Sequence, residues 1–555
     1  MTTNDNGLHF LANGPSRAWQ GPIESIAFDA AGIRDRLLNL GKPCYIVEQQ
    51  NRIGITNEGR LCHPDDSGST TEASLKNLVS SPPLSIQRLG DPAFLATYGV
   101  KYAYIAGSMA NAISGEELVI ALGKKKILSS FGAGGLAPDR VKAAIHRIQQ
   151  ALPAGPFAFN LIHSPSEAAL ERNAVDLYLK YGVTTIEASA FMNLTPYVVY
   201  YRVAGLGLDA ANQIEIKNRV IAKISRREVA TKFLQPAPAN ILTHLVEQGL
   251  ITELQATLAE KVPMADDITV EADSGGHTDN RPLVCLLPSI IALRDELQEK
   301  YRYPDKVRIG AAGGIGTPAS ALGAFMMGAA YILTGSINQA CVEAGTSQHT
   351  RTLLAQAEMT DVFMAPAADM FEMGVKLQVL KRGTFFPMRA QKLFDFYKKY
   401  NSIEEIPAAE REKLEKQVFR KKLETVWENT VTFFNERDPD QIRRATNNLK
   451  RKMALTFRWY LGLASRWANL GEKGREMDYQ IWCGPSMGAF NDWVRGTYLA
   501  ESGNRHVADI ARHIMTGAAF LYRLQDLKIQ GLQIPAHLGQ YSPAPRLPSH
   551  VLSST

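Results

Sequence analysis

Cysteine is scarce in this chain. Only five cysteines occur among 555 residues, and they are widely scattered with no CxxC pair. An odd number of separated cysteines is typical of a protein from a reducing compartment. The spacing also argues against a zinc site, so we predict no bound metal.

Long apolar runs are missing as well. The longest one, around residues 320–333, is broken by glycines and is too short to span a bilayer. The opening residues MTTNDNGLHFLANG lack the basic and then apolar segments of a secretory signal. The hydrophobic content of 45% and the charged content of 21% are ordinary for a soluble globular protein. We therefore expect a cytoplasmic protein with no membrane span.

Positive charge is concentrated in one part of the chain. The formal net charge is +6, and residues 381–460 hold 19 Lys or Arg against 11 Asp or Glu. No nucleic-acid reader motif accompanies this charge, so we expect no nucleic-acid partner. It predicts either a patch that steers an acidic protein or a solvated helical face. Paired basic residues that could form the patch are Lys398, Lys399, Lys421, Lys422, Arg443, Arg444, Arg451 and Lys452.

Eight short apolar runs recur between residues 101 and 336, with Gly or Pro breaks and helix-like segments between them. They are YAYIAG, KILSSFGA, FAFNLI, TTIEAS, VIAKIS, DITVEAD, RIGAAGG and YILTGS. Eight strands that alternate with helices over this length predict an α/β fold of the (β/α)8 TIM barrel type. A doubly wound sheet is the alternative, but the GxGxxG pattern after the first strand is missing.

The remaining segments flank or interrupt this barrel, which we assign to residues 101–350. A helical insertion near 226–266 could act as a lid. Residues 1–100 predict an N-terminal extension with a hairpin, CYIVEQQNRIGITNEGRL, and a Ser/Pro-rich linker, SGSTTEASLKNLVSSPPL. Residues 351–531 show helical periodicity. The Pro- and Ser-rich tail, 532–555, is predicted to be disordered.

Glycines follow the seventh and eighth predicted strands, in AAGGIGTPASALGAF and LTGSINQA. The loops after these two strands form the usual phosphate site of such barrels, because backbone N–H groups and a helix N-terminus meet there. We predict that Gly313, Gly314, Gly335 and Ser336 bind a phosphate. The alternative is that the glycines only permit tight turns.

A phosphate at this place implies a ligand that extends across the barrel mouth. The motif GSMANAIS offers small residues and backbone amides at Gly107, Ser108, Met109 and Ala110, and Asn160 lies in the third strand. These groups suit the edge and face of a flat ring. Flavin mononucleotide (FMN) combines such a ring with a phosphate.

Lys223 lies near the end of the fifth predicted strand. It could bind the ligand, or it could form a structural ion pair inside the barrel with Glu187 or Glu271. The sequence leaves both roles open.

Several motifs in this order resemble a known superfamily. GSMANAIS, FNL, SGGH, AAGGI and LTGS are similar to the motifs of the nitronate monooxygenase and flavin-dependent enoyl-ACP reductase superfamily of FMN barrels. FNLIHSP, TIEASAFMNLTPYVVYYRVAGL, EADSGGHTDNRP and YQIWCGPSMGAFNDWV resemble the PfaD-type trans-acting enoyl reductases of polyunsaturated fatty acid and polyketide synthases. This resemblance covers residues 91–531.

The resemblance implies a function and a set of partners. It implies FMN as cofactor, NADPH as reductant, and a trans-2-enoyl thioester on acyl carrier protein as substrate. Synthase subunits would be partners, and we expect a homo-oligomer. The alternatives are a nitronate monooxygenase-like flavin oxygenase and a non-catalytic assembly subunit.

The resemblance also places His277 of the SGGH motif at the active-site histidine position. Gly275 and Gly276 would let the flavin pack against the backbone, and His277 would project over the ring. Histidine suits proton transfer near neutral pH. The alternative is a histidine that only binds the flavin or closes the pocket. Asp273 and Asp279 could orient it or stay solvated, and the sequence leaves both open.

Overall fold

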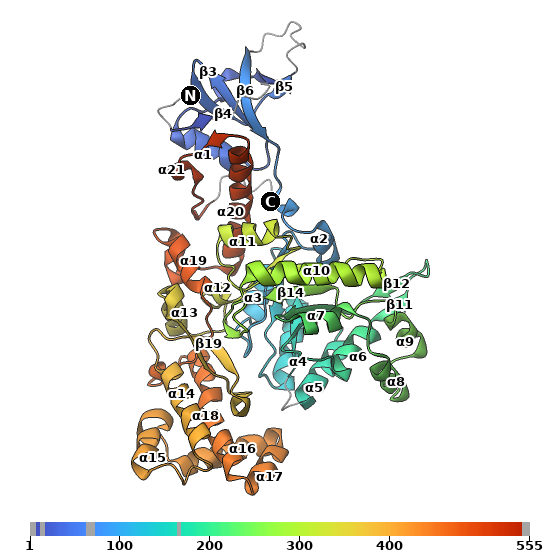
Figure 1. The fold of residues 1–555 in the computed structure, drawn as a ribbon, viewed down its shortest axis with the longest axis vertical. Helices are drawn as coiled ribbons and strands as arrows, with labels where there is room; N and C mark the ends of the chain where they lie inside the picture. Colours follow the sequence, from blue (N-terminus) through green and yellow to red (C-terminus); the bar gives the residue numbers. More distant parts are fainter. Residues whose placement is uncertain (1–6, 11–16, 63–72, 164–167, 547–555) are drawn as a thin grey trace.

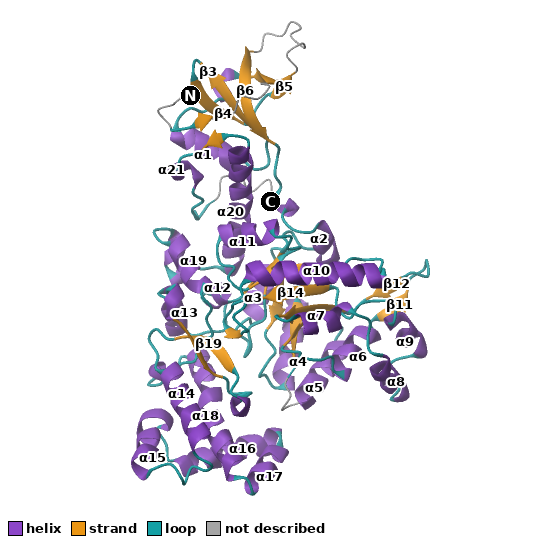
Figure 2. Cartoon of the chain, in the orientation of Figure 1, coloured by secondary structure: helices purple, strands orange, loops and turns teal. Residues whose placement is uncertain are grey.

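The computed structural model describes residues 7–10, 17–62, 73–163 and 168–546. Its centre is a closed barrel of eight parallel strands (Figures 1 and 2). Around the barrel, the strands are β10 (Thr185–Ser189), β13 (Arg219–Ile224), β14 (Asp267–Glu271), β16 (Arg308–Ala312), β17 (Ile332–Thr334), β7 (Tyr104–Ala106), β8 (Leu128–Phe131) and β9 (Ala158–Ile162). The predicted barrel is confirmed, and the doubly wound alternative is wrong.

Burial on both faces explains the composition of the barrel strands. All five residues of β16, RIGAA, are buried, as strands covered by helices outside and by side chains inside should be. At the amino ends of the strands, Arg308 Nε lies 2.6 Å from Asp267 Oδ1, and both side chains are buried. This ion pair closes the end of the barrel opposite the mouth.

Helices cover the barrel from outside. They are α3 (Glu116–Gly123), α4 (Pro138–Ala151), α5 (Ala168–Lys180), α6 (Pro196–Ala204), α7 (Arg227–Leu234), α10 (Leu283–Tyr301), α11 (Pro318–Met326) and α12 (Ser336–Gln339). In α4 the buried residues Val141, Ala144, Ile145 and Ile148 follow the helical period. This spacing gives one apolar stripe that packs on the barrel.

The insertion after β13 does not cover the mouth. Its helices α8 (Ala239–Glu247) and α9 (Glu253–Ala259) pack against α6 and, for α9, against the hairpin strand β11 (Leu206–Leu208). Figure 1 shows them at the outer edge of the barrel. Neither helix contributes to the cavity at the mouth. The interpretation as a lid is therefore wrong.

The N-terminal part forms a five-stranded sheet. In order, its strands are β4 (Arg52–Thr56), β3 (Cys44–Gln49), β6 (Ala73–Ser81), β2 (Arg17–Gly21) and β5 (Arg60–Cys62). The predicted hairpin is confirmed as β3 and β4. The predicted linker is wrong for residues 73–81, because they form β6, the central strand. Its buried residues, Asn77, Val79 and Ser81, alternate along the strand. Residues 67–72 of that linker lie outside the described residues.

A second small sheet joins the C-terminal part to the barrel mouth. Its strands are β15 (Gly276–His277), β19 (Lys376–Leu380) and β18 (Val362–Pro366), with β19 in the middle. The helices α14 (Phe386–Lys399), α15 (Ala408–Leu414), α16 (Leu423–Arg437), α17 (Pro439–Thr446) and α18 (Leu449–Leu470) follow. Figure 1 shows β19 between these helices and the barrel. Residues 351–531 are therefore mainly helical, and the two strands β18 and β19 extend to the barrel mouth.

The last long helix, α20 (Val507–Ile529), connects the barrel to the N-terminal sheet. It packs on α11 and on β6. Beyond it, β20 (Leu532–Gln533) pairs with β1 (His9–Phe10), and α21 (Ala536–Gly539) follows. The predicted disorder is thus wrong for residues 532–546, where Leu532 and Leu538 are buried. Residues 547–555 lie outside the described part. No described helix combines the length and the apolar character needed to cross a membrane.

Candidate active site

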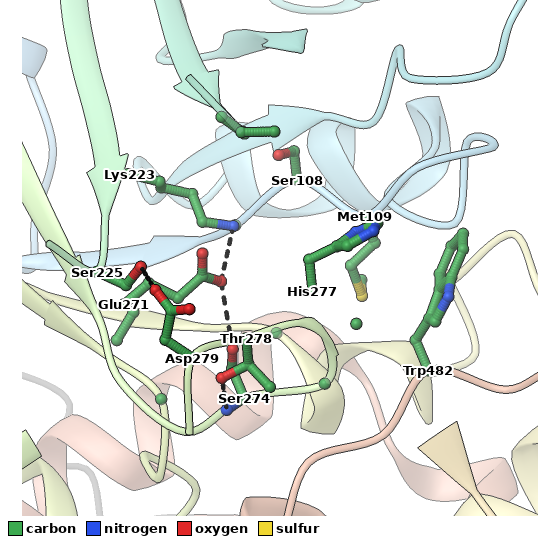
Figure 3. Close-up of a pocket in the computed structure, with 18 of the residues that line it drawn as sticks. Ser108, Met109, Lys223, Ser225, Glu271, Ser274, His277, Thr278, Asp279 and Trp482 are labelled. Atoms are coloured by element: carbon green, nitrogen blue, oxygen red, sulfur yellow. Dashed lines mark hydrogen bonds and ion pairs between the residues drawn. The ribbon is translucent and has the colours of Figure 1, made fainter. Parts of the chain in front are cut away.

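A cavity of about 490 Å³ opens at the carboxyl ends of the barrel strands. Figure 3 shows part of its wall. Every site residue predicted from the sequence lines it: Gly107, Ser108, Met109, Ala110, Asn160, Lys223, Gly275, Gly276, His277, Gly313, Gly314, Gly335 and Ser336. The fold therefore gathers into one cavity residues that six different barrel strands carry.

Glycines at the ends of β16 and β17 line the part of the cavity where we predict a phosphate. A Cβ atom on Gly314 or on Gly335 would meet no other atom within 4 Å, so the backbone there faces open space. Gly313 differs, because its Cβ would lie 2.6 Å from the backbone of Ala272. Packing requires glycine at position 313, whereas positions 314 and 335 leave room for a ligand.

Ser336 also lines this part of the cavity. The backbone N–H of Gly484 donates to Ser336 Oγ over 3.0 Å. The oxygen accepts this bond, which leaves the hydroxyl proton for another acceptor. Backbone amides and a hydroxyl donor are the groups that bind phosphate monoesters. The residues therefore fit the phosphate of FMN.

The two glycines of the SGGH motif lie in different surroundings. A Cβ on Gly275 would lie 2.9 Å from the backbone of Cys483 and Gly484, so this residue is needed for contact with a distant loop of the same chain. Gly276 has φ of +84° and open space where a Cβ would be. Both glycines line the cavity, and the expectation that the flavin packs against their backbone stays a prediction.

His277 is paired with a carboxylate from the C-terminal part. Its Nε2 lies 3.2 Å from Asp369 Oδ1. Burial lowers the pKa of His277, but the hydrogen bond to Asp369, its charge and that of Glu271 outweigh burial, so the pKa is raised. Figure 3 shows the imidazole reaching toward Met109, with Trp482 beyond it. The arrangement suits a histidine that gives a proton to a group in the cavity.

Asp273 and Asp279, which the sequence offered as residues that could orient His277, have other partners. Asp279 accepts from Ser225 Oγ at 2.6 Å and from Arg226 Nε at 2.9 Å. The bond from Arg226 is the main reason that its pKa falls to about 2. Asp273 Oδ1 accepts from Gln378 Nε2 at 2.8 Å. Neither carboxylate orients the imidazole, so that hypothesis is wrong.

Lys223 forms ion pairs with both carboxylates that the sequence offered as partners, Glu187 and Glu271. Its Nζ lies 3.1 Å from Glu271 Oε1 and 3.6 Å from Glu187 Oε1. Burial lowers the pKa of Lys223, and the two carboxylates more than compensate, so the pKa is raised. Ser108 Oγ donates to Glu187 over 2.6 Å. The structural ion pair is confirmed, and the flavin role stays a prediction, because Lys223 also lines the cavity.

Asn160 is engaged within the barrel wall. Its Nδ2 donates to Glu187 O at 3.0 Å and to Ser189 Oγ at 2.7 Å. The side-chain nitrogen therefore fixes the strand end, and only the rest of the side chain is left for a ligand.

Three family models match separate parts of the chain. The nitronate monooxygenase model matches residues 92–391. The model for the N-terminal domain of fatty acid synthase subunit PfaD matches residues 19–83. The model for the inserted helical domain of [acyl-carrier-protein] S-malonyltransferase matches residues 400–479. These ranges correspond to the barrel region, the N-terminal sheet and the helices α15 to α18.

Curated relatives come from lipid and polyketide synthases. One polyunsaturated fatty acid synthase subunit of Thraustochytrium sp. is 48% identical over 521 residues, which are 93% of this chain and 34% of the relative. Polyketide biosynthesis protein PksE of Bacillus subtilis is 44% identical over 455 residues, 82% of this chain and 58% of PksE. The chain thus spans a part of each relative's length.

A solved structure is similar over most of its length. The enoyl reductase domain of MlnA from Bacillus amyloliquefaciens is 41% identical, with a TM-score of 0.76 over 80% of this chain and 99% of that domain. Barrel and relatives together define a flavin-type oxidoreductase. The chain belongs to the nitronate monooxygenase family, in the group that includes the MlnA enoyl reductase domain.

Proposed function

We propose that this protein is an FMN-dependent enoyl reductase. It reduces the trans-2 double bond of enoyl thioesters on acyl carrier protein, with NADPH as reductant, in polyunsaturated fatty acid or polyketide biosynthesis. The observation that carries the proposal is the His277–Asp369 pair, which faces the same cavity as the open glycine cradle. A proton donor and a phosphate-binding cradle are the two parts that an FMN-dependent reduction needs.

The chain offers a place for each part of FMN. The phosphate would be bound by the backbone at Gly314 and Gly335 and by the hydroxyl of Ser336. The ring would lie near Met109 and Lys223, which also line the cavity. When bound, FMN supplies the hydride chemistry between the nicotinamide and the β-carbon of the substrate.

His277 would supply the proton for the α-carbon. Asp369 holds the imidazole through Nε2 and favours its protonated form, so the acid is available at a higher pH than for an isolated histidine. The side chain of His277 is 39% exposed, so solvent can return the proton after each turnover. The residue therefore combines a fixed position with access to water.

The carrier protein would dock on the basic helices. Several of the basic residues identified from the sequence are paired within the chain: Lys422 with Glu415 at 2.7 Å, and Arg443 with Asp440 at 2.8 Å. Lys421 and Arg444 are exposed and have no ion pair among the described residues. Their charge is left to attract an acidic partner, which would raise its association rate.

The test is a product analysis. Purified protein is incubated with NADPH and a trans-2-enoyl thioester on acyl carrier protein, and the acyl group is measured by mass spectrometry. The proposal predicts a mass gain of two hydrogens without oxygen consumption. Oxygen consumption with a nitronate and an unchanged enoyl group would instead identify a nitronate oxygenase and overturn the proposal.

A further inference from the structure

A second histidine lies at the barrel mouth. His163 follows β9 directly, and its side chain lines the same cavity as His277. Its backbone N–H donates to Ser189 O over 3.0 Å, which continues the pairing of β9 with β10 by one residue. His163 is therefore placed by the barrel itself.

A buried carboxylate fixes the ring of His163. Its Nδ1 lies 2.8 Å from Glu171 Oε2, and the side chain of Glu171 is 1% exposed. The hydroxyl of Thr195 hydrogen-bonds the other oxygen of Glu171. Thr195 Oγ1 also accepts from the backbone N–H of Val198 at the start of α6. Since that bond uses the oxygen as acceptor, the hydroxyl proton points to Glu171.

These contacts place the two groups. Thr195 donates to one oxygen of Glu171, and the other oxygen lies within hydrogen-bond distance of His163 Nδ1, which can donate to it. A buried carboxylate needs a cationic partner, and among the described residues no lysine or arginine hydrogen-bonds Glu171. His163 is the partner that can carry that charge.

Stacking on an aromatic ring also constrains the orientation of the His163 imidazole. The ring of His163 lies on the ring of Phe191, with centroids 5.4 Å apart and an interplanar angle of 27°. Glu171 lies on α5, outside the barrel, and binds the Nδ1 edge of the imidazole. The opposite edge, with Nε2, is left for the cavity.

The strand order separates the two histidines. Around the barrel, β10 and β13 lie between β9, which precedes His163, and β14, which precedes His277. The two side chains thus approach the cavity from different sides of the mouth. A substrate that lies across the mouth can contact both of them.

We propose that the imidazolium of His163 donates a hydrogen bond from Nε2 to the carbonyl oxygen of the enoyl thioester, with Glu171 as its positioning residue. This inference rests on the proposed function. When hydride adds to the β-carbon, the electrons of the double bond move to form an enolate, whose negative charge lies on that oxygen. His277 then gives a proton to the α-carbon and the carbonyl is restored. His163 keeps its proton throughout.

Exposure supports this division of roles. A group that gives up a proton in every turnover needs resupply from water, and the side chain of His277 is 39% exposed. A group that only stabilises charge benefits from a fixed, shielded position. The side chain of His163 is 21% exposed and bound to a buried carboxylate.

The test is isotope-edited infrared spectroscopy of a short trans-2-enoyl thioester with a ¹³C-labelled carbonyl. The thioester is bound to the oxidised holoenzyme without NADPH, so that no turnover occurs. A hydrogen bond lowers the carbonyl stretching frequency. We expect this shift in the wild type and in His277→Ala, its loss in His163→Ala, and an intermediate shift in His163→Gln, which keeps an amide donor. Glu171→Gln should reduce it.

Kinetic measurements on the same variants provide a second test. Loss of one donor to a developing oxyanion costs roughly 10²- to 10³-fold in kcat. His163→Ala should lose about this much, and His163→Gln should recover part of it. An unchanged carbonyl shift in His163→Ala with thioester bound would overturn the inference, and loss of the shift in His277→Ala would assign the donor to His277. If His163→Ala does not fold, the same measurements on His163→Gln and Glu171→Gln decide. A wild type that reduces no enoyl thioester would instead contradict the proposed function.

Discussion

His277 and Asp369 are 92 positions apart in the sequence, and their side chains meet at 3.2 Å. The pairing of β15 with β19 brings the two segments together, with His277 opposite Leu377. The C-terminal part thus contributes a carboxylate to the cavity. Burial lowers the pKa of His277, and the bond to Asp369 acts in the opposite direction and raises it.

Asp369→Asn should shift the pH dependence of enoyl reduction. The carboxylate raises the pKa of His277, so its removal lowers that pKa, and the acid form is lost at a lower pH. The alkaline limb of the kcat profile should therefore move to lower pH. Asp279→Asn is the matched control, because Asp279 pairs with Arg226. Equal movement in both variants, or none in Asp369→Asn, would contradict the role of Asp369.

Gly335→Asp should abolish FMN retention. A Cβ at this position meets open space and φ is −132°, so the backbone accepts the change, whereas Gly314 has φ of +72°. The new carboxylate would repel the phosphate by several kcal/mol at low effective dielectric. Gly335→Asn has the same size without the charge and should keep more flavin. Flavin absorbance of the purified variants measures this, and a fully yellow aspartate variant would remove the phosphate assignment.

Lys223→Met should destabilise the fold. It leaves Glu187, which is fully buried, and Glu271 without their cation. Removal of one partner of a buried ion pair costs about 3–5 kcal/mol. Adding Glu187→Gln should recover part of the loss, because one buried charge is removed. Denaturant unfolding monitors the effect, and an unchanged free energy of unfolding for Lys223→Met would show that the ion pairs contribute nothing to stability.

Reversal of the unpaired basic residues should weaken carrier docking. Lys421→Glu with Arg444→Glu should raise KM for a carrier-bound enoyl substrate and flatten its salt dependence. Turnover of a small soluble enoyl thioester should hardly change. Lys422→Glu with Arg443→Glu, at positions that are already ion-paired, is the control for local destabilisation. Equal losses with both substrates would show that the charges support the fold instead.

The barrel could be predicted because its information is local. Each strand is a short apolar run and each helix, such as α4, shows its own period. The cavity residues could be predicted once the barrel was, because all of them lie at the strand ends of one barrel. The central strand β6 was missed because its serines and asparagine resemble a linker, although Asn77, Val79 and Ser81 alternate inward.

The long-range parts of the site could not be predicted in the same way. Asp369 and Trp482 reach the cavity through segments far from the barrel strands. The residue pattern near Asp369 or Trp482 does not predict which barrel strand the segment will contact. The strings EADSGGHTDNRP and YQIWCGPSMGAFNDWV resemble one family, and this resemblance was the available indication that both segments belong to the site. The structure shows that the two segments are in contact, because Gly275 lies against Cys483 and Gly484.

In the proposed reaction, electrons pass from NADPH to an enoyl thioester, and His277 gives the proton. The most direct measurement follows flavin absorbance without oxygen. NADPH should bleach the wild type and His277→Ala alike. An enoyl thioester should then restore the absorbance, roughly 10²- to 10⁴-fold more slowly in His277→Ala. Recovery only on admission of oxygen would contradict enoyl reduction, and equal recovery in both proteins would contradict His277 as the proton donor.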